Sequence, residues 1–495
     1  MEKGKEKRNL AQLLEGVKPL KIVGTVDREV LSLESDSRKA SAGSMFVAVK
    51  GVTVDGHSFV AGLAGKGLAA IVVEHLPEQT DPEVTYIVVE NSAIALGQLA
   101  SQWWDNPSRK LKLIGVTGTN GKTTTATLIY EMTRLFGEKA GLLSTVCNYV
   151  DTRAVATSQT TPDPLTINSL LAEMVAEGCT VCAMEVSSHA ADQHRIAGLK
   201  FTGAIFTNLT RDHLDYHKTV DAYLAAKKSF FDGLDSDAFA LTNLDDKVGE
   251  VMLQNTSAKK YTYSLRSQAD FVGRIIESRI DGTLISFNGQ EVETLFTGRF
   301  NAYNLTAVYG ATILMGRPVD ETLVNMSRLV PVAGRFQSVR SADGVTAIVD
   351  YAHTPDAVVN VLQAIREVTG NNNRIFTVVG AGGNRDKGKR PIMAREAALR
   401  SDVLILTSDN PRFEEPQDIL RDMEAGISDD KELMTRSLSI ADRRQAIRTA
   451  VKMAHPGDVI LIAGKGHEDY QEIRGVKHHF DDRETVIQLF DEIRH

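Results

Sequence analysis

Cysteine is scarce in this chain of 495 residues, which has only Cys147, Cys179 and Cys182. Three cysteines cannot build the disulfide framework that stabilises many small secreted domains. Cys179 and Cys182 have the C-x-x-C spacing of some redox and metal sites, but they lie in an apolar, strand-like stretch. We therefore expect buried structural cysteines and a reducing, cytoplasmic environment.

Long hydrophobic runs and a surplus of positive charge are also missing. No apolar run is long enough to span a bilayer, and the charged residues 1–8 lack the apolar core of a signal peptide. The 64 acidic side chains exceed the 56 of lysine and arginine, which gives a formal net charge of −8. We expect neither membrane insertion nor a nucleic-acid partner, because a broad basic surface is not indicated. Local positive sites for small anionic ligands are still allowed.

What is present is the composition of a globular protein, with 42% hydrophobic and 24% charged residues, and the length predicts about three domains. Residues 1–108 are predicted to form a small α/β domain that ends at the turn-rich segment 105–108. Residues 109–334 are predicted to form a mostly parallel sheet with helices and a small β-rich insertion at one edge. Residues 335–495 are predicted to form a Rossmann-like α/β domain. The expected fold class is therefore α/β.

Apolar runs place the expected strands. They lie at 45–49 and 69–73 in the first domain, at 111–116, 181–186, 204–207 and 239–242 in the second, and at 347–350, 375–379, 403–406 and 459–462 in the third. The turn pairs Asp281-Gly282 and Asn288-Gly289 predict hairpins within 266–300. Ligands of open α/β sheets bind beyond the carboxyl ends of the strands, so the polar residues that follow these runs are site candidates.

Residues 111–125 carry the most informative motif, an apolar strand followed by Gly-Thr-Asn-Gly-Lys-Thr-Thr. Gly118 and Gly121 allow a sharp turn whose N–H groups approach an anion. Lys122 can reach the outer phosphates of a nucleotide, Thr123 can offer its hydroxyl to Mg²⁺, and the next helix directs its positive end at the phosphates. The common pattern has glycine where this chain has Val116, so this is a variant P-loop. An ordinary strand-to-helix turn with a surface lysine is the alternative.

Two further polar clusters follow neighbouring strands. Residues 185–189 read Glu-Val-Ser-Ser-His, and residues 208–217 read Asn-Leu-Thr-Arg-Asp-His-Leu-Asp-Tyr-His. Both are expected at the sheet edge that carries the P-loop, where a carboxylate and an imidazole can hold Mg²⁺ beside a triphosphate. The alternative is helix capping by Ser187, Ser188 and Asp212. The segment 223–228 is expected to be helical, and its Lys227, taken alone, reads as a solvated helix lysine.

These motifs, in this order along the chain, resemble those of the Mur ligases, ATP-dependent enzymes that build the peptide stem of bacterial peptidoglycan. The resemblance continues through Gly-Arg-Phe-Asn-Ala-Tyr-Asn at 298–304, Asp-Tyr-Ala-His-Thr-Pro at 350–355 and Gly-Lys-Gly-His-Glu at 464–468, and it covers essentially the whole chain. It is greatest to the branch that adds the third amino acid to UDP-N-acetylmuramoyl-L-alanyl-D-glutamate.

The resemblance implies roles for individual residues. It implies ATP contacts at Gly118, Thr119, Asn120, Gly121, Lys122, Thr123, Thr124, Asn304, Arg335, Asp350 and His353. It implies Mg²⁺ ligands at Thr123, Glu185, His213 and Lys227, and catalytic roles for Lys122, Glu185, His213 and Lys227. Lys227 would carry a carbamate made with CO₂, which replaces an ammonium by an anion. Only the resemblance overturns the reading of Lys227 as a solvated side chain.

The resemblance also implies substrate contacts. The UDP-linked substrate would meet Ser37, Thr160, Thr161, Ser187, Gln193 and Arg195, and the incoming amino acid would meet Arg385, Asp409, Asn410, Pro411, Arg412, Gly464 and Glu468. Without the other matches, the segment around Ser37 would be read as a plain turn, and Arg412 as a surface arginine after a proline turn.

The Asp-Asn-Pro-Arg motif at 409–412 resembles that of family members that use meso-2,6-diaminopimelate. The far end of this amino acid carries a carboxylate that lysine lacks, and a guanidinium binds a carboxylate with two parallel hydrogen bonds. We therefore expect meso-diaminopimelate as substrate. A ligase that adds L-lysine or ornithine is the nearest alternative.

The expected reaction is ATP-dependent amide formation through an acyl phosphate, with closure by the third domain, in a bacterial cytoplasmic monomer. His353 is a candidate base by location only. A folylpolyglutamate-synthase-like ligase shares the nucleotide-binding core, but the N-terminal domain with its Asp-Ser-Arg segment argues against it. A P-loop module that binds nucleotide without chemistry could lose Lys122, Glu185 or Lys227, whereas this chain has all three.

Overall fold

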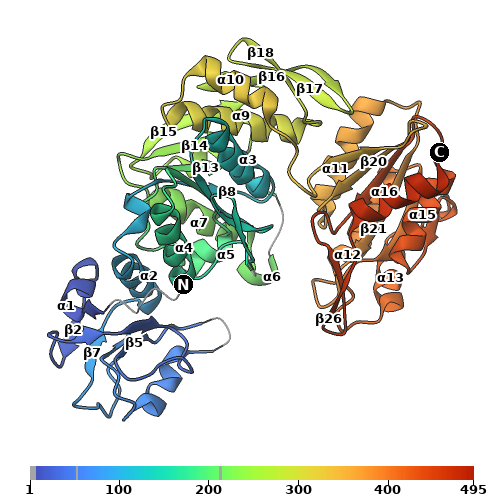
Figure 1. The fold of residues 1–495 in the computed structure, drawn as a ribbon. Coiled ribbons are helices and arrows are strands. Elements are labelled where there is room, and N and C mark those ends of the chain that lie inside the picture. The colour runs from blue at the N-terminus through green and yellow to red at the C-terminus, as the bar shows by residue number, and fades with distance from the viewer. Residues whose placement is uncertain (1–6, 52–53, 158, 211–213, 495) are drawn as a thin grey trace.

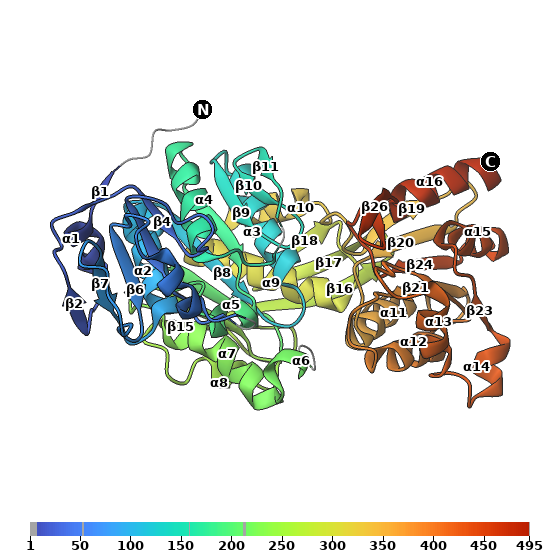
Figure 2. The same cartoon turned by 90° about the horizontal axis from the view of Figure 1, so that it is seen from below.

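The computed structural model of the chain describes residues 7–51, 54–157, 159–210 and 214–494. They form three α/β units that follow one another in a row, from the N-terminal unit at one end to the C-terminal unit at the other (Figure 1, Figure 2). The three predicted domain ranges contain one main sheet each, of five, eleven and six strands in chain order. The α/β class is confirmed, and the domain boundaries stay a prediction.

The N-terminal unit is built on a sheet with the strand order β2-β7-β6-β5-β4. Its elements are β1 Arg8–Asn9, α1 Leu10–Leu13, β2 Lys21–Val23, β3 Glu29–Val30, β4 Ser32–Glu34, β5 Ser44–Val47, β6 Ala70–Val73, β7 Thr85–Val88 and α2 Ser92–Trp103. The predicted turn after α2 is present, because Asp105 and Asn106 both adopt left-handed backbones with φ of 56° and 52°. Asp and Asn tolerate this conformation better than other non-glycine residues.

The central unit has the strand order β11-β10-β9-β12-β8-β13-β14-β15-β16-β17-β18. Its strands are β8 Lys112–Thr117, β9 Ala140–Leu143, β10 Asn148–Val150, β11 Arg153–Val155, β12 Val181–Glu185, β13 Gly203–Phe206, β14 Phe239–Asn243, β15 Lys259–Ser264, β16 Phe271–Arg279, β17 Gly282–Phe287 and β18 Gln290–Thr294. Its helices are α3 Lys122–Leu135, α4 Pro164–Ala176, α5 Ser188–Asp192, α6 Leu214–His217, α7 Val220–Asp232, α8 Gly249–Met252, α9 Arg299–Leu314 and α10 Val319–Arg328.

In the order of the sheet, the seven neighbouring strands β9, β12, β8, β13, β14, β15 and β16 pair in parallel. The strands at the two edges, β10 and β11 on one side and β17 and β18 on the other, are antiparallel to their neighbours. The predicted hairpins are present as β16, β17 and β18, and the second turn lies at Asn288-Gly289 as predicted. The first turn lies at Ile280-Asp281, one residue earlier than predicted, because Gly282 already belongs to β17. A second hairpin, β10 with β11, lies at the opposite edge and was not predicted. Its strands are only three residues long, and Asp151 makes the turn between them without a glycine.

The register of the central sheet brings three chain segments to one edge. Val116 of β8 lies opposite Glu185 of β12 on one side and Ile205 of β13 on the other. The segments that begin at Gly118, Val186 and Thr207 therefore leave the sheet next to one another. This is the convergence expected of the carboxyl ends of parallel strands.

The C-terminal unit has the strand order β19-β20-β24-β21-β22-β23. Its strands are β19 Gln337–Arg340, β20 Thr346–Asp350, β21 Ile375–Ala381, β22 Val403–Ser408, β23 Ser437–Ser439, β24 Val459–Ala463 and the separate hairpin β25 Tyr470–Ile473 with β26 Val476–His479. Its helices are α11 Pro355–Thr369, α12 Lys389–Arg400, α13 Pro416–Glu424, α14 Lys431–Thr435, α15 Arg443–Met453 and α16 Asp482–Ile493. The four predicted strands form the parallel core. Edge strands β19 and β23 were missed because they lack apolar runs.

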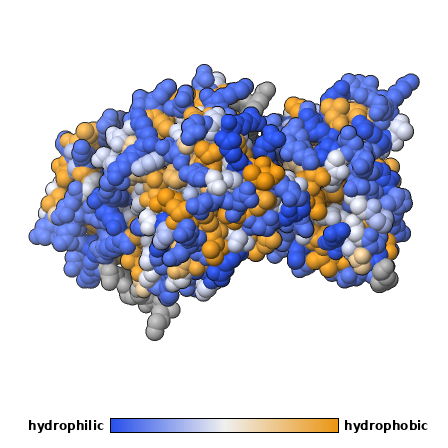
Figure 3. Space-filling model, turned by 90° about the horizontal axis from the view of Figure 1, so that it is seen from above, coloured by the Kyte–Doolittle hydropathy of each residue, from blue (hydrophilic) through white to orange (hydrophobic). Residues whose placement is uncertain are grey.

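Apolar side chains are gathered between the sheets and their helices, and the face drawn in Figure 3 is mostly hydrophilic with separate apolar patches. Cys179 and Cys182 are buried, all three thiols are free, and burial raises the pKa of the Cys182 thiol. These observations support the structural role predicted for the cysteines. Among the described residues, no helix combines the length and the apolar character needed to cross a membrane.

Candidate active site

The P-loop adopts a conformation that requires both of its glycines. Gly118 has a φ of 147° and Gly121 a φ of 86°. A Cβ atom at Gly118 would lie 1.9 Å from Oγ1 of Thr207, and a Cβ at Gly121 would lie 2.4 Å from Oδ1 of Asn304. No side chain fits at either position. Helix α3 begins directly afterwards at Lys122, so its N-terminal N–H groups face the loop.

The segment after β13 holds the P-loop in place. The backbone N–H of Thr119 donates to the carbonyl of Asn208 at 2.8 Å, and the N–H of Asn120 donates to Asn208 Oδ1 at 2.9 Å. The hydroxyl of Thr207 donates to the carbonyl of Asn120 at 2.6 Å. The sequence predicted Asn208 at this sheet edge, as the first residue of the cluster 208–217, but it predicted no role for Asn208 or Thr207 in holding the P-loop.

Two side chains of the first helical turn already have partners in this structure. The ammonium of Lys122 donates to the carbonyls of Gly118 and Thr119, each at 2.9 Å. The hydroxyl of Thr123 accepts a hydrogen bond from Nη2 of Arg335 at 3.1 Å. The structure therefore places Arg335, which comes from the segment leading into the C-terminal unit, at the P-loop helix.

Lys227 is buried, and its reading as a solvated helix lysine was wrong. Its side chain lies in α7 and is 1% exposed, its ammonium donates to the carbonyl of Gly118 at 2.8 Å, and it lies 4.6 Å from the ring centre of Tyr223. The signal was in the sequence. Tyr223, Ala226, Lys227 and Phe230 follow the i, i+3, i+4, i+7 spacing of one helix face, and all four are buried.

Glu185 ends β12 with a fully buried carboxylate. Its Oε1 accepts the backbone N–H of Thr145 at 2.8 Å, and its Oε2 accepts the Thr145 hydroxyl at 3.2 Å. His213, the third predicted metal ligand, lies outside the described residues. Among the residues that the structure does describe, no group of three or more His, Cys, Asp and Glu side chains could hold a metal ion.

The residues predicted to hold the muramoyl peptide form one connected group next to Glu185. The hydroxyl of Thr161 donates to the Glu185 carbonyl at 2.8 Å and accepts the N–H of Ser187 at 3.0 Å. Arg195 donates to the Thr161 carbonyl at 2.9 Å and to Gln193 Oε1 at 2.7 Å. Thr160, the remaining member of this group, accepts a hydrogen bond from the hydroxyl of Thr145 at 3.1 Å. Ser187 also caps α5, since its hydroxyl accepts the N–H of Ala190, so the capping alternative is correct for this residue.

Ser37 lies in the N-terminal unit, in a turn after β4. The carboxylate of Asp36 accepts the backbone N–H and the Nε–H of Arg38 at 3.0 Å and 2.9 Å. Within the described part of the chain, no hydrogen bond joins Ser37 to the other residues predicted to hold the UDP-linked substrate. The structure thus brings together the residues predicted to bind the peptide, without a hydrogen bond from Ser37 to any of them in its described part.

Asp350 ends β20 and organises the domain junction. Its carboxylate accepts the N–H groups of Phe336 and Ala352, each at 2.7 Å, and burial raises its pKa. His353, three residues later, is exposed, and its Nδ1 lies 2.9 Å from the carbonyl of Tyr351. Both carboxylate oxygens of Asp350 thus serve the backbone, which makes a direct nucleotide contact by this group less expected than one by Arg335.

The junction also contains a close contact between two chain segments. Gly334 has a φ of 66°, and a Cβ atom there would lie 2.0 Å from the backbone nitrogen of His467. Burial, together with the nearby charge of Arg335, lowers the pKa of His467 to about 4. The buried Nδ1 of His467 has no hydrogen-bond partner among the described residues.

The predicted amino-acid contacts gather at the carboxyl edge of the C-terminal sheet. Ala463 lies opposite Asp350, and Ser408 lies opposite Ala381, so the segments that follow these strands emerge together. Gly464 has a φ of 116°, and a Cβ atom there would lie 2.6 Å from Oδ2 of Asp409. The two loops that begin at 409 and 464 are therefore in contact.

A buried lysine joins these two loops. Asn410 Nδ2 donates to Glu468 Oε2 at 2.7 Å, and the ammonium of Lys465 lies 3.3 Å from both Asn410 Oδ1 and Glu468 Oε2. Lys465 is fully buried. Burial raises the pKa of Glu468, and the charge of Asp409 acts in the same direction. Lys465 was missed as a functional residue, although it lies inside the Gly-Lys-Gly-His-Glu motif.

Arg412 and Arg385 approach each other at Gly382. A Cβ atom at Gly382 would lie 3.0 Å from Nη1 of Arg412 and 3.7 Å from Cγ of Arg385. Arg412 Nη1 donates to the carbonyl of Gly383 at 2.8 Å, and its Nε lies 3.5 Å from Oε2 of Glu472. Its Nη2 has no hydrogen-bond partner among the described residues. Pro411 fixes the loop from the other side, since a Cβ at Gly383 would lie 1.9 Å from its carbonyl oxygen.

A buried arginine that sequence reasoning missed supports both arginine loops. Arg390 is 1% exposed and donates to both oxygens of Glu414 at 2.9 Å, to Asp422 at 2.8 Å and to the carbonyl of Gly382 at 3.1 Å. The hydrogen bonds from Arg390 lower the pKa of Glu414 to about 2. The loop with Arg385 and the loop with Arg412 thus share one anchor.

Three family profiles match the chain in succession. They are described as "Mur ligase family, catalytic domain" at residues 29–104, "Mur ligase middle domain" at 116–312 and "Mur ligase, glutamate ligase domain" at 334–466. The three matched ranges fall on the three main sheets.

Individual proteins extend the likeness to nearly the whole chain. UDP-N-acetylmuramoyl-L-alanyl-D-glutamate–2,6-diaminopimelate ligase of Parabacteroides distasonis is 60% identical over 97% of this chain and 99% of its own. A solved structure of a ligase with the same name has a TM-score of 0.70 and 31% identity, and covers 99% of this chain and 100% of its own. MurF ligase from Thermotoga maritima in complex with ADP has a TM-score of 0.57 at 20% identity, over 93% of this chain and 97% of its own.

The chain thus matches these relatives over nearly its whole length. It also has the variant P-loop, the buried Lys227 and the two contacting loops of the third sheet. The chain belongs to the Mur ligase family.

Proposed function

We propose that this protein is an ATP-dependent ligase of the MurE type, which adds meso-2,6-diaminopimelate to UDP-N-acetylmuramoyl-L-alanyl-D-glutamate. One observation supports the choice of amino acid above the others. Arg412, Asp409 and Glu468 come from two loops that touch at one sheet edge. The far end of diaminopimelate carries one carboxylate and one ammonium, and these three side chains offer one guanidinium and two carboxylates.

The first half of the reaction takes place at the central sheet. The γ-carboxylate of the D-glutamyl residue attacks the γ-phosphorus of ATP, which forms an acyl phosphate and releases ADP. Lys122 and the N-terminal N–H groups of α3 are placed to offset the negative charge that builds up on the phosphate oxygens. To do so, Lys122 exchanges its present contacts with Gly118 and Thr119 for the phosphates.

The second half joins the two substrates. The neutral α-amine of diaminopimelate attacks the acyl carbon, the tetrahedral intermediate expels phosphate, and the amide remains. The amine must lose a proton in this step, and no described side chain is assigned as its base. Since Arg335 already touches Thr123, a further approach of the third domain toward the P-loop is the motion that would bring the amino acid to the acyl phosphate.

The residues present fit an Mg²⁺ site. Mg²⁺ prefers oxygen ligands and keeps several waters, and Glu185 and Thr123 supply a buried carboxylate and a hydroxyl at the P-loop edge. We propose these two and His213 as metal-binding residues. When bound, Mg²⁺ would supply charge neutralisation for the phosphates. Thr123 would then have to release the hydrogen bond from Arg335.

Lys227 fits the proposed carbamate. Its amine would combine with CO₂ to give a carbamate and one proton, and burial in general disfavours the competing ammonium. The carbamate nitrogen keeps one N–H, which can still donate to the Gly118 carbonyl that Lys227 contacts now. The product would be an anionic oxygen pair beneath the P-loop, suited to a second Mg²⁺.

Selection of the amino acid rests on Arg412. Its Nη2 faces no partner among the described residues, so it can join Nη1 in a two-point grip on a carboxylate. With lysine bound, the guanidinium would meet no carboxylate there, and sites built around such a contact can discriminate by about 10⁴-fold or more. We propose Arg385 as a second contact, and Glu468 and the Gly464 carbonyl as acceptors for the distal ammonium.

The test is a ligation assay with ATP, the UDP-linked dipeptide and one amino acid at a time. We expect ADP release and a UDP-linked tripeptide with meso-diaminopimelate, and at most trace product with L-lysine or L-ornithine. A clear preference for lysine would overturn the role given to Arg412. Absence of product with every amino acid would support the nucleotide-binding module instead.

Other properties stay proposals. We propose domain boundaries near 108 and 334, a monomer, and action in the bacterial cytoplasm, where UDP-linked precursors and ATP are both present. The folylpolyglutamate-synthase alternative is less well supported, because a Mycobacterium tuberculosis enzyme of that name covers only 74% of this chain, at 16% identity, which speaks to fold alone.

A further inference from the structure

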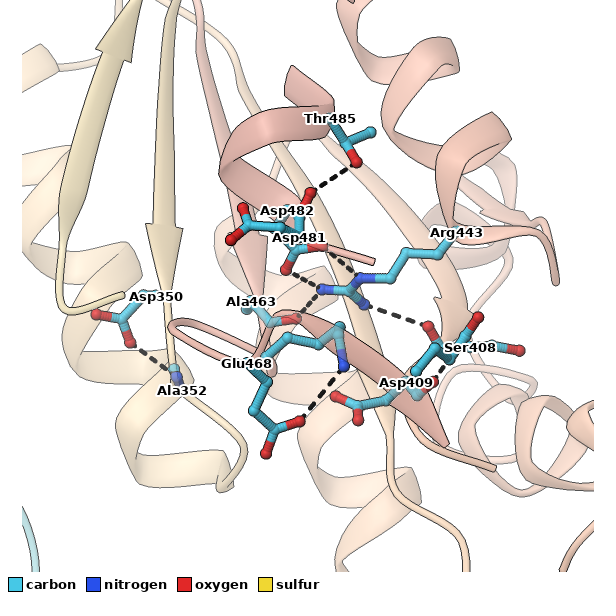
Figure 4. Close-up of polar contacts among 12 residues, drawn as sticks. Asp350, Ala352, Ser408, Asp409, Arg443, Ala463, Glu468, Asp481, Asp482 and Thr485 are labelled. Atoms are coloured by element: carbon cyan, nitrogen blue, oxygen red, sulfur yellow. Dashed lines mark hydrogen bonds and ion pairs between the residues drawn. The ribbon is translucent and has the colours of Figure 1, made fainter. Parts of the chain in front are cut away.

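Two buried charges lie behind the amino-acid site, and the proposed mechanism uses neither of them. Arg443 begins helix α15, Asp482 begins helix α16, and both side chains are 0% exposed. One edge of the guanidinium faces the carboxylate through two parallel hydrogen bonds, in which Nε donates to Oδ1 and Nη2 donates to Oδ2, each at 2.7 Å (Figure 4). This two-point geometry fixes the direction of the guanidinium plane.

The same guanidinium reaches two backbone carbonyls. Nη1 donates to the carbonyl of Ser408 at 3.3 Å, and Nη2 donates to the carbonyl of Ala463 at 3.0 Å. Ser408 ends β22 and Ala463 ends β24, and β21 lies between these strands in the sheet. Arg443 therefore bridges the carboxyl ends of two strands that share no hydrogen-bond ladder.

Each of these carbonyls belongs to the residue just before a proposed substrate segment. Residues 409–412 follow Ser408, and residues 464–468 follow Ala463. A shift of either strand end would therefore change the spacing between Asp409 and Glu468. On the basis of the proposed function, we propose that Arg443, held by Asp482, is a positioning residue that sets the spacing of the two segments that bind diaminopimelate.

Stability alone explains this pair poorly. A buried ion pair often contributes no more to stability than apolar side chains of the same volume, because both charges lose their hydration. The charges of the site also act on Arg443. Burial acts to lower the pKa of its guanidinium, but the carboxylates of Asp482, Asp409 and Glu468 outweigh this effect and raise the pKa. Arg443 is therefore electrostatically coupled to the two carboxylates that face the substrate.

The proposal is tested by Arg443→Lys and Asp482→Asn in the full-length enzyme. Arg443→Lys keeps the positive charge but has three donors on a single nitrogen, too few for the four hydrogen bonds that Arg443 makes with Asp482 and the two carbonyls. We expect the KM for diaminopimelate to rise roughly 10- to 100-fold, the scale of a misplacement of about 1 Å. The KM values for ATP and for the UDP-linked dipeptide should stay near those of the wild type.

Arg444→Ala is the matched control. Arg444 is the next residue of α15 and also binds α16, through Gln488 at 3.0 Å and Glu492 at 3.2 Å, but on the surface and without touching the strands. All three KM values should be unchanged in this variant. If Arg443→Lys and Asp482→Asn lower the melting temperature but leave the KM for diaminopimelate unchanged, or raise all three KM values equally, the pair serves stability only and the proposal is wrong.

A measurement on the wild type decides the question if the variants do not fold. With the UDP-linked dipeptide and a non-hydrolysable ATP analogue bound, added diaminopimelate should slow hydrogen exchange together in peptides from 404–412, 459–468 and 443–447. Protection of the two loops without any change at 443–447 would contradict the proposal. If the wild-type enzyme does not ligate diaminopimelate, the proposed function is wrong instead. This activity is measured before any variant is made.

Discussion

Arg335 and Thr123 join two domains, because Nη2 of Arg335 donates a hydrogen bond to the Thr123 hydroxyl at 3.1 Å. Thr123 lies in the first turn of the helix after the P-loop, and Arg335 lies in the segment that enters the C-terminal domain. The guanidinium carbon of Arg335 also lies 4.6 Å from the ring centre of Tyr351, just after β20. Arg335 thus connects the segment that enters the third domain with the first turn of the helix after the P-loop.

Substitution of Arg335 should weaken the binding of ATP more than the binding of the other two substrates. We expect Arg335→Ala to raise the KM for ATP by about 10- to 100-fold, because a hydrogen bond to a charged group contributes about 1.5–3 kcal/mol. Steady-state kinetics with each substrate varied in turn would check this. Arg340→Ala, an exposed arginine of β19, is the control and should behave as wild type. An unchanged KM for ATP would remove Arg335 from the nucleotide site.

Replacement of Lys227 should abolish most of the turnover. We expect Lys227→Ala to lower kcat by about 10²-fold or more, since charge placed at the reacting phosphates is a large part of catalysis. With ¹³C-labelled bicarbonate, the wild type should show a carbamate ¹³C resonance that Lys227→Ala lacks.

The neighbouring lysine provides the control for this experiment. Lys228 is the next residue of α7 and is paired with Asp232, so Lys228→Ala should keep both the resonance and the turnover. A resonance that survives in Lys227→Ala would place the carbamate elsewhere.

Arg412 should determine the choice of amino acid. We expect Arg412→Ala to raise the KM for diaminopimelate by roughly 10- to 100-fold, the effect of losing a charge-assisted two-point contact. The ratio of kcat/KM for diaminopimelate to that for lysine should fall as well. The preference ratio, measured as kcat/KM for each amino acid, is the readout. Arg474→Ala, an exposed arginine that pairs with Glu415 nearby, should leave the ratio unchanged. A ratio that Arg412→Ala does not alter would contradict this role.

His467 should make the protein less stable in mild acid. Its folded pKa of about 4 lies below the unfolded value of 6.5, so the unfolded chain binds more protons between these values. The free energy of unfolding should therefore fall as the pH drops from 6.5 to 4, by about 3 kcal/mol from this residue. Urea titrations of wild type and His467→Gln at several pH values would show a flatter dependence for the variant.

His479 offers a control of opposite sign. The hydrogen bond that its ring N–H donates to the Glu484 carboxylate raises the pKa of His479, so its contribution to stability is present in acid and is lost as the pH rises through the folded pKa. His479→Gln should therefore keep the acid sensitivity due to His467. Equal slopes for wild type and His467→Gln would show that the neutral imidazole is not what acid disrupts.

Most of the fold followed from local patterns in the sequence. The parallel strands are continuous apolar runs because both faces of such sheets are covered, and the Gly-rich turn after β8 marked the P-loop. Edge strands such as β23, Ser437–Ser439, could not be found this way, because an edge strand takes its partners from tertiary context and needs no apolar run.

The candidate site was predictable where motifs mark it and not where support is remote. Lys227 shows how one side chain taken alone can mislead, since the spacing of its neighbours in α7 already placed it on the buried face. Arg443 is a buried cation, and its ion-pair partner Asp482 lies far along the chain, in another helix. No local spacing announces such a partner. For Ser37, a motif match alone predicted a contact with the UDP-linked substrate, and this contact stays a prediction.

Gly334 has a consequence for how the enzyme moves. Its backbone packs against that of His467, so the segment that leaves the central domain touches the loop that is proposed to receive the third amino acid. We therefore expect a rotation of the last domain to be coupled to a change in the shape of that loop at this contact. A small molecule bound at this contact would restrain both the last domain and the loop, without resembling ATP, the UDP-linked dipeptide or the amino acid.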